Sequence, residues 1–246
     1  MIVILSPAKN INISEFQNFK FEKPIFLQEA LKINENLKSL QPQDIEILMK
    51  VNSDIAFKTF RNLQDFNINI QNSHALKSYD GLVFKNINVE DFNDEDIIFA
   101  NETIRILSGL YGVLKPLNFI QNYRLEMGLK IKIEDSKNLY DFWKDKIYNE
   151  IFKQNKPVLN LASKEYTKSI SPFLKENDKF INVDFLLLKN GKYKTIATSA
   201  KMARGQMARY IIKNKIKDIE LLKDFYFEEY SYNEHLSSEN NLIFSN

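Results

Sequence analysis

The chain has 246 residues, 44% of them hydrophobic and 13% aromatic, which is enough apolar material for one or two folded domains. Its 34 basic and 32 acidic residues leave a net charge of only +2, so an anion site must arise from local clustering of cations. The absence of cysteine excludes disulfides, thiolate metal sites and thiol-based peroxide chemistry. No apolar run reaches the roughly 20 residues of a membrane helix, and we expect a cytosolic protein without a signal peptide.

Glycine and histidine usage argues against several familiar cofactor sites. Only six glycines occur, and neither the dinucleotide pattern G-x-G-x-x-G nor the phosphate-loop pattern G-x-x-x-x-G-K-[ST] is found. The two histidines, His74 and His235, are far apart and form no HExxH zinc motif. We therefore expect no cofactor and no bound metal.

The first predicted elements are a strand and three helices. The unbroken apolar run 1–5 predicts a short buried strand. A helix is predicted over 24–40, and a second begins at Pro42, a residue favoured in the first helical turn. Ser53 is expected to cap the third helix.

A strong helix start follows at 93–96, which reads Asn-Asp-Glu-Asp. Apolar residues at helical spacing then continue as far as Gly109, so one helix is predicted over this stretch. Together with Asp91, the acids also allow a metal cluster as an alternative. We interpret them as a capping residue and helix-start charges.

The second half of the chain mixes helices and strands. Amphipathic spacing predicts helices at 139–152 and 200–216. Asn190-Gly191 is a favoured two-residue hairpin turn. Strands are predicted at 158–162, 180–188, 193–198 and, at the sheet edge, 241–244. The order of elements indicates an α/β or α+β fold around one sheet.

Three polar stretches carry possible chemistry, and the first two are short. Ser6 to Lys9 directly follow the first strand, where a site can be held on a rigid scaffold, although an ordinary turn also explains them. The glycine-containing segment 107–127 holds Lys115, and its Arg124 and Glu126 would form an ion pair if they lie on one strand face. A tightly folded core segment is the alternative.

The third stretch comes in two parts. Residues 160–168 again follow a strand, and Ser163 is placed to cap a helix whose start would attract anions. On helix 200–216, Lys201 and Arg204 share a face, and Gly205 beside them would allow close approach of another group. A solvated basic face is the alternative. Several cations are candidates to converge on one cleft: Lys9, Lys115, Arg124, Lys164, Lys168, Lys201 and Arg204.

The helices of residues 42–66 offer a second nucleic-acid element. Two short helices around a tight break can present backbone amides to a DNA phosphate, with Lys50, Lys58 and Arg61 close by. Helix-hairpin-helix modules normally carry glycine in the hairpin, and none is present here. A plain pair of antiparallel helices therefore stays open as the alternative.

Five motifs together resemble the YaaA family of peroxide stress resistance proteins. They are SPAK at 6–9, LSGLYGVLKPL at 107–117, YRLEMG at 123–128, NLASKEYTK at 160–168 and AKMARGQMARYI at 200–211. The resemblance implies a single α/β domain over 1–246 with a basic cleft, a helix-hairpin-helix-like element, double-stranded DNA binding and a cytosolic role against hydroperoxide and iron damage. The positions that match are Ser6, Lys9, Arg124, Glu126, Asn160, Ser163, Glu165, Tyr166, Lys168, Lys201, Arg204 and Gly205.

The leading hypothesis is a non-enzymatic stress protein that grips DNA phosphates with little sequence specificity. The expected DNA contacts are Lys9, Lys50, Lys58, Arg61, Lys168, Lys201 and Arg204. The alternative is an enzyme that acts on a nucleotide or another phosphorylated small molecule in the same cleft, with Glu126 or Glu165 as acid–base group. A long open groove would favour DNA, whereas a closed pocket of roughly 300–1,000 Å³ containing either glutamate would favour a small substrate.

Overall fold

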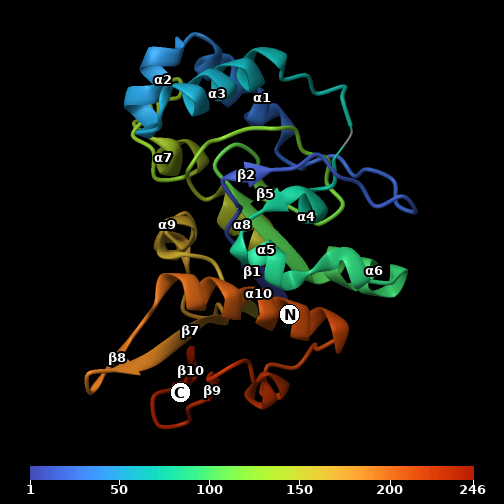
Figure 1. The fold of residues 1–246 in the computed structure, drawn as a ribbon, viewed down its shortest axis with the longest axis vertical. Helices are drawn as coiled ribbons and strands as arrows, with labels where there is room; N and C mark the ends of the chain where they lie inside the picture. Colours follow the sequence, from blue (N-terminus) through green and yellow to red (C-terminus); the bar gives the residue numbers. More distant parts are fainter. Residues whose placement is uncertain (72) are drawn as a thin grey trace.

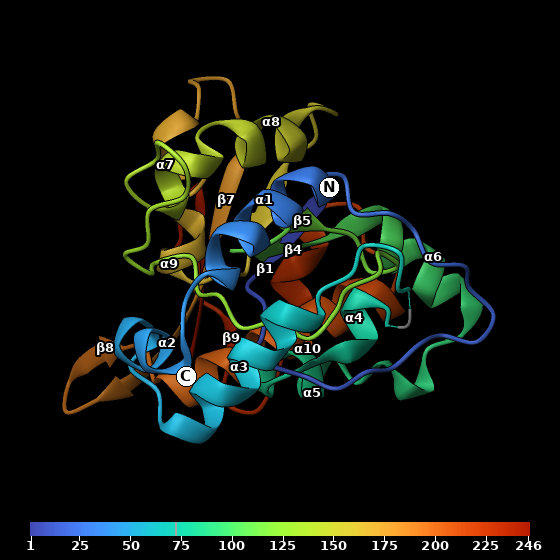
Figure 2. The same ribbon diagram turned by 90° about the horizontal axis from the view of Figure 1, so that it is seen from above.

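The computed structural model describes residues 1–71 and 73–246, and a mixed sheet runs through its centre (Figures 1 and 2). The strand order is β5-β4-β1-β6-β7-β10-β9, and β8 pairs with β7. Pairing is parallel from β4 through β1, β6 and β7 to β10, and antiparallel for β5, β8 and β9. The predicted mixed α/β class is confirmed. The strands are β1 (Ile2–Leu5), β4 (Ile104–Ser108), β5 (Gly112–Leu114), β6 (Val158–Asn160), β7 (Phe180–Lys189), β8 (Lys192–Lys194), β9 (Ser231–Tyr232) and β10 (Asn241–Ser245).

The central strands are buried on both faces, which explains their composition. All four residues of β1 are buried, as are all five of β4. Parallel strands covered on both sides read as continuous apolar runs rather than alternating ones. Because β1 and β6 are parallel neighbours, with Ile4 opposite Asn160, their carboxyl ends lie side by side at one edge of the sheet.

Helices cover the sheet on both sides (Figure 1). A layer formed by α1, α2 and α3 lies at one end of the molecule, and α10 crosses the other half beside α5 (Figure 1). A second, two-stranded sheet pairs β2 (Asn10–Ile11) with β3 (Tyr79–Asp80). The helices are α1 (Leu27–Lys38), α2 (Pro42–Met49), α3 (Ser53–Asp65), α4 (Ala75–Ser78), α5 (Leu82–Ile87), α6 (Asp94–Thr103), α7 (Leu139–Trp143), α8 (Lys146–Phe152), α9 (Lys164–Thr167) and α10 (Ala197–Lys213). Short 3₁₀ turns occupy Val89–Asp91, Ser171–Phe173 and Glu220–Asp224.

Several predicted boundaries are wrong, each for a local reason. The helix predicted as far as Gly109 ends at Thr103, because the next five residues form β4 between β1 and β5. Tertiary pairing overrides the helical spacing there. The helix predicted over 139–152 divides into α7 and α8 at Lys144, whose φ of 44° is left-handed.

Smaller corrections concern caps and edges. Asn52, rather than Ser53, caps α3, because its side chain accepts a hydrogen bond from the Ile55 amide. Strand β10 is not an edge strand, since it lies between β7 and β9. The helix predicted from residue 24 begins only at Leu27. The Asn190-Gly191 hairpin turn is confirmed, with φ of 53° and 72°.

The acidic start of α6 has a structural role. Asp96 is buried and contacts the ammonium groups of Lys213 and Lys215, and Asp91 pairs with Arg209. These contacts tie the end of α10 to the start of α6. Among the described residues, no group of three or more histidine, cysteine, aspartate or glutamate side chains is arranged to hold a metal ion.

Candidate functional site

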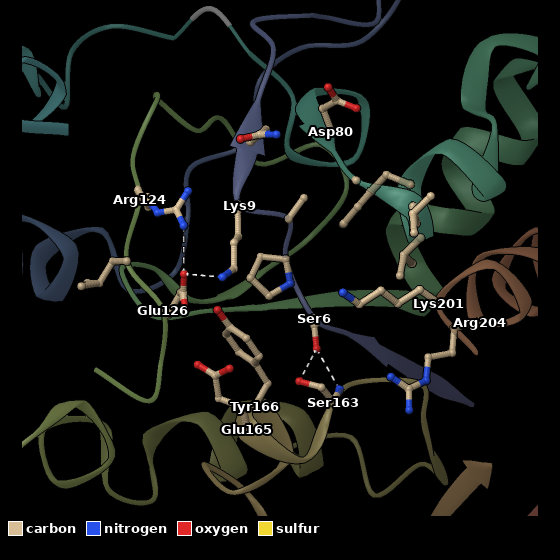
Figure 3. Close-up of a pocket in the computed structure, with 18 of the residues that line it drawn as sticks. Ser6, Lys9, Asp80, Arg124, Glu126, Ser163, Glu165, Tyr166, Lys201 and Arg204 are labelled. Atoms are coloured by element: carbon tan, nitrogen blue, oxygen red, sulfur yellow. Dashed lines mark hydrogen bonds and ion pairs between the residues drawn. The ribbon is translucent and has the colours of Figure 1, made fainter. Parts of the chain in front are cut away.

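A cavity of about 320 Å³ opens at the carboxyl end of β1 (Figure 3). Its walls come from the turn after β1, the start of α5, the loop around Glu126, the turn after β6, and α10. These segments are distant in sequence and meet because the sheet order places β1 beside β6. The lining residues with polar side chains are Ser6, Lys9, Asn10, Asp80, Tyr123, Arg124, Glu126, Ser163, Glu165, Tyr166, Lys201 and Arg204.

A serine pair joins the ends of the two parallel strands. The Ser163 main-chain N–H donates to the Ser6 Oγ at 2.8 Å, and the Ser6 hydroxyl lies 3.2 Å from the Ser163 Oγ. Ser163 stands at the start of α9, as predicted, but its side chain makes no capping bond to that helix. The two strand ends are therefore fixed to each other instead.

Glu126 is shared by two cations. Its Oε1 lies 2.9 Å from the Lys9 Nζ and 3.3 Å from the Arg124 Nη2. The expected Arg124–Glu126 pair is thus formed, although this segment is a loop rather than a strand. One carboxylate facing two cations leaves a local excess of positive charge.

Glu165 is held by the loop that follows Glu126. Its Oε1 accepts a hydrogen bond from the Gly128 amide at 2.8 Å, and its main-chain carbonyl accepts one from the Tyr140 hydroxyl at 2.9 Å. These bonds fix the first turn of α9 against the loop. The Glu165 carboxylate is therefore positioned at the cavity wall.

Helix α10 supplies two further cations. Figure 3 shows Lys201 extending from α10 toward the middle of the cavity, with Arg204 on the same helix beside it. Burial lowers the pKa of the Arg204 guanidinium, and Asp184 partly offsets that effect, so the group stays charged. The Arg204 Nε is buried and has no hydrogen-bond partner among the described residues.

Two tyrosines, Tyr123 and Tyr166, line the cavity, and Tyr79 lies behind Tyr123. The Tyr123 hydroxyl lies 2.7 Å from the Ser108 Oγ and 2.5 Å from the Tyr79 hydroxyl. Burial raises the pKa of Tyr123 to about 12, and it raises the pKa of Tyr79 and Tyr166 as well. These phenols are therefore neutral at physiological pH and serve as aromatic surface and hydrogen-bonding groups, not as bases.

The cavity brings together nine of the residues singled out from the sequence. They are Ser6, Lys9, Arg124, Glu126, Ser163, Glu165, Tyr166, Lys201 and Arg204. Its four basic side chains face three carboxylates, so its interior is of mixed charge. It has the volume expected for a small-substrate pocket and contains both candidate glutamates, but it is partly open to solvent, since the Lys9 side chain in its wall is 63% exposed.

Other expected site residues lie in two adjoining hollows. One, of about 230 Å³, includes Lys58 and shares Lys9 and Arg124 with the cavity. The other, of about 890 Å³, includes Asn160 and Lys168 and shares Ser163 and Arg204 with it. Asn160 also has a structural role, because its Oδ1 accepts the Ala162 amide at 2.9 Å and its Nδ2 donates to Asn182 at 2.8 Å.

Four expected residues are absent from the lining of these three hollows. Lys50 and Arg61 are exposed on the α2–α3 hairpin. Lys115 instead faces Glu22, with its Nζ 3.7 Å from the carboxylate. Gly205 is buried under α5, where an added Cβ would collide with the Val83 carbonyl oxygen. Helix α5 of the same chain is thus the group that packs closely against Gly205.

Three polar lining residues, Asn10, Asp80 and Tyr123, were not among those singled out from the sequence. Asp80 lies on β3, and Lys85 pairs with it at 3.1 Å. Gly81 next to it offered a signal, because glycine is rare in this chain. A Cβ there would lie only 2.9 Å from the Ala8 Cβ, so this glycine lets two cavity walls meet.

The profile of a protein family described as peroxide stress protein YaaA matches residues 1–236. The chain belongs to this family. A UPF0246 protein of Clostridioides difficile is 42% identical over 244 residues, covering 99% of each chain. Its counterpart in Clostridium perfringens is 43% identical over 256 residues, covering 100% of this chain and 99% of the relative. A relative in Saccharophagus degradans is 38% identical over a similar span. The YaaA resemblance drawn from the five motifs is confirmed.

Proposed function

We propose that this YaaA-family chain is a cytosolic protein that limits iron- and hydroperoxide-mediated damage by binding double-stranded DNA. The observation that carries the proposal is that three hollows adjoin one another, because they share Lys9 and Arg124 at one junction and Ser163 and Arg204 at the other. We call this run of hollows the furrow. A furrow of this kind can follow a DNA backbone over several phosphates, which a single pocket cannot.

Charge along the furrow supports the same proposal. Seven basic side chains line it, against the four carboxylates of Asp80, Glu126, Glu165 and Asp184. Contacts to phosphates carry no base information, so binding is expected to be weakly sequence-specific and strongly salt-dependent. The basic residues are Lys9, Lys58, Arg124, Lys164, Lys168, Lys201 and Arg204.

The α2–α3 hairpin is proposed as a second DNA contact. Lys50 ends α2 in the left-handed conformation, with φ of 51°, which is the backbone state that glycine usually provides in such turns. A lysine therefore supplies the left-handed residue of the turn between α2 and α3. Lys58 of α3 lies in the furrow, while Lys50 and Arg61 are exposed elsewhere on the same hairpin.

The protective effect is proposed to be physical shielding of DNA. A chain without cysteine has no thiol with which to reduce hydroperoxide. Shielding needs only that bound protein excludes oxidants and iron from the duplex.

The test is fluorescence anisotropy of a labelled 20-base-pair duplex at several salt concentrations. Log affinity is expected to fall linearly with log salt, at a slope of about −0.9 per phosphate contacted. The double charge reversal Lys201→Glu with Arg204→Glu should weaken binding. Lys156→Glu with Lys217→Glu, which changes the charge equally outside the furrow, serves as the control. Absence of binding at low salt would overturn the proposal.

One observation favours a second candidate function, an enzyme acting on a phosphorylated small molecule. The cavity of about 320 Å³ holds Glu126 and Glu165 together with Lys201 and Arg204. That combination of acid–base groups and phosphate-binding cations suits a small anionic substrate. Thermal-shift measurements with nucleoside mono- and triphosphates test it, since a specific ligand would raise the melting temperature by an amount that grows with the logarithm of its concentration relative to Kd.

A further inference from the structure

The cavity is too small for a DNA duplex and large enough for a single nucleotide. The major groove of B-DNA alone is about 12 Å wide. The cavity of about 320 Å³ falls at the lower end of the range of small-molecule sites, about 300–1,000 Å³. A duplex that follows the furrow would therefore pass over the cavity without filling it. This leaves a cavity that opens directly beneath the proposed DNA path.

The wall of the cavity has the character of a nucleobase site. Tyr123 and Tyr166 present aromatic surface, and Pro7, Leu82 and Val83 add apolar surface. Because burial raises the pKa of both tyrosines, they carry no charge that would repel a base or a phosphate. Unstacked bases bind on such aromatic surfaces irrespective of sequence.

Polar side chains in the cavity match the base and the phosphate of a nucleotide. The Glu126 and Glu165 carboxylates are acceptors that match the exocyclic amino groups of bases. On the opposite wall, Lys201 and Arg204 lie one helical turn apart on α10 (Figure 3). Arg204 is also shared with the next hollow, and its buried Nε has no partner among the described residues. A phosphate at this junction would lie on the proposed path of the backbone.

We infer that the cavity binds a single nucleotide turned out of the duplex, with its base against Tyr166 and its phosphate at Lys201 and Arg204. This inference rests on the proposed DNA binding. Turning a nucleotide out costs stacking and pairing energy, and that cost is smallest where the base is mismatched or damaged. The protein therefore binds preferentially to DNA that contains an unpaired nucleotide.

The experiment compares two 20-base-pair duplexes by anisotropy at one salt concentration, one fully paired and one with a central mismatched deoxycytidine, whose exocyclic amino group matches the carboxylates of the cavity. Wild-type protein is expected to bind the mismatched duplex about tenfold more tightly, since the mismatch lowers the cost of extrusion. Leu82 lines the cavity and is 39% exposed, so the larger side chain of Leu82→Trp should fill the cavity. This variant should lose the preference for the mismatched duplex and keep the wild-type affinity for the paired duplex. Leu221→Trp, at a residue that is 50% exposed outside the furrow, is the matched control.

A crosslink locates the unpaired base without any variant. A 5-iododeoxycytidine at the mismatch, irradiated in the complex with wild-type protein, should crosslink to residues 123–126 or 161–166. Equal affinities for the two duplexes, or crosslinks confined to other segments, would overturn the inference and leave DNA binding intact. Absence of binding to both duplexes would overturn the proposed function and this inference together.

Discussion

Ser163 donates its main-chain N–H to the Oγ of Ser6 at 2.8 Å, although the two residues are 157 positions apart. The bond joins the ends of β1 and β6, from which two walls of the cavity continue. Both serines are partly buried, so water replaces this bond poorly. The integrity of the cavity should therefore depend on it.

Ser6→Ala is expected to lower the free energy of unfolding by about 1 kcal/mol, because the Ser163 amide loses its acceptor. Urea denaturation measures the effect. Ser53→Ala, at an exposed position on α3, should change stability by less than about 0.5 kcal/mol. Equal effects of the two substitutions would show that the bond between the strand ends contributes nothing specific.

Glu126→Gln should strengthen binding of fully paired DNA, because Lys9 and Arg124 lose the carboxylate that they share. The gain in affinity should be several-fold at low salt and should shrink as salt screens the furrow. Glu134→Gln is the matched control, since Glu134 is 55% exposed and pairs with Lys32 outside the furrow. Weaker binding by Glu126→Gln would mean that the carboxylate itself contacts the DNA.

Asp96 should make stability depend on pH. Burial opposes its ionisation, but hydrogen bonds from Lys213 and Lys215 outweigh this and lower the pKa of Asp96. A carboxylate whose pKa is lowered on folding stabilises the folded state at pH values above its pKa in the unfolded chain, which is about 3.9. This stabilisation is lost as the pH falls through the pKa of the folded state. Asp96→Asn should therefore cost about 1–3 kcal/mol at pH 7 and progressively less below pH of about 4.

Urea denaturation of both proteins at pH 7 and pH 3 measures this difference. Asp94→Asn, at an exposed residue in the same helical turn, is the control and should show a small effect at both pH values. A cost of Asp96→Asn that is equal at the two pH values would rule out the ionised carboxylate as its source.

Gly205→Ala should destabilise the protein, although alanine is normally the better helix former by about 1 kcal/mol. An added Cβ would collide with the Val83 carbonyl oxygen and press on the Asn86 Cβ, forcing α5 away from α10. Overpacking of this kind costs about 1–3 kcal/mol. Thermal unfolding measures the loss, with Thr198→Ala on the exposed side of α10 as control. Unchanged or increased stability would show that the two helices separate at no cost.

Local signals in the sequence determined a large part of this protein. The apolar run of β1, the proline at the start of α2 and the Asn190-Gly191 turn each act through neighbouring residues, and each is confirmed. The Asn93 capping box also forms as the local pattern predicts. Such features depend on backbone dihedrals and on hydrogen bonds within a few residues, which short-range sequence specifies.

The tertiary structure alone decided where these elements meet. Ile104 and Leu107 keep helical spacing and still form a strand, because a place between β1 and β5 buries them better than a helix would. Gly205 was expected to allow close approach of another group, and that group is α5. The cavity exists because the sheet order puts the ends of β1 and β6 side by side, which adds Asp80 and Tyr123 and leaves Lys115 outside. Strand order depends on contacts between residues more than a hundred positions apart, and no local pattern encodes them.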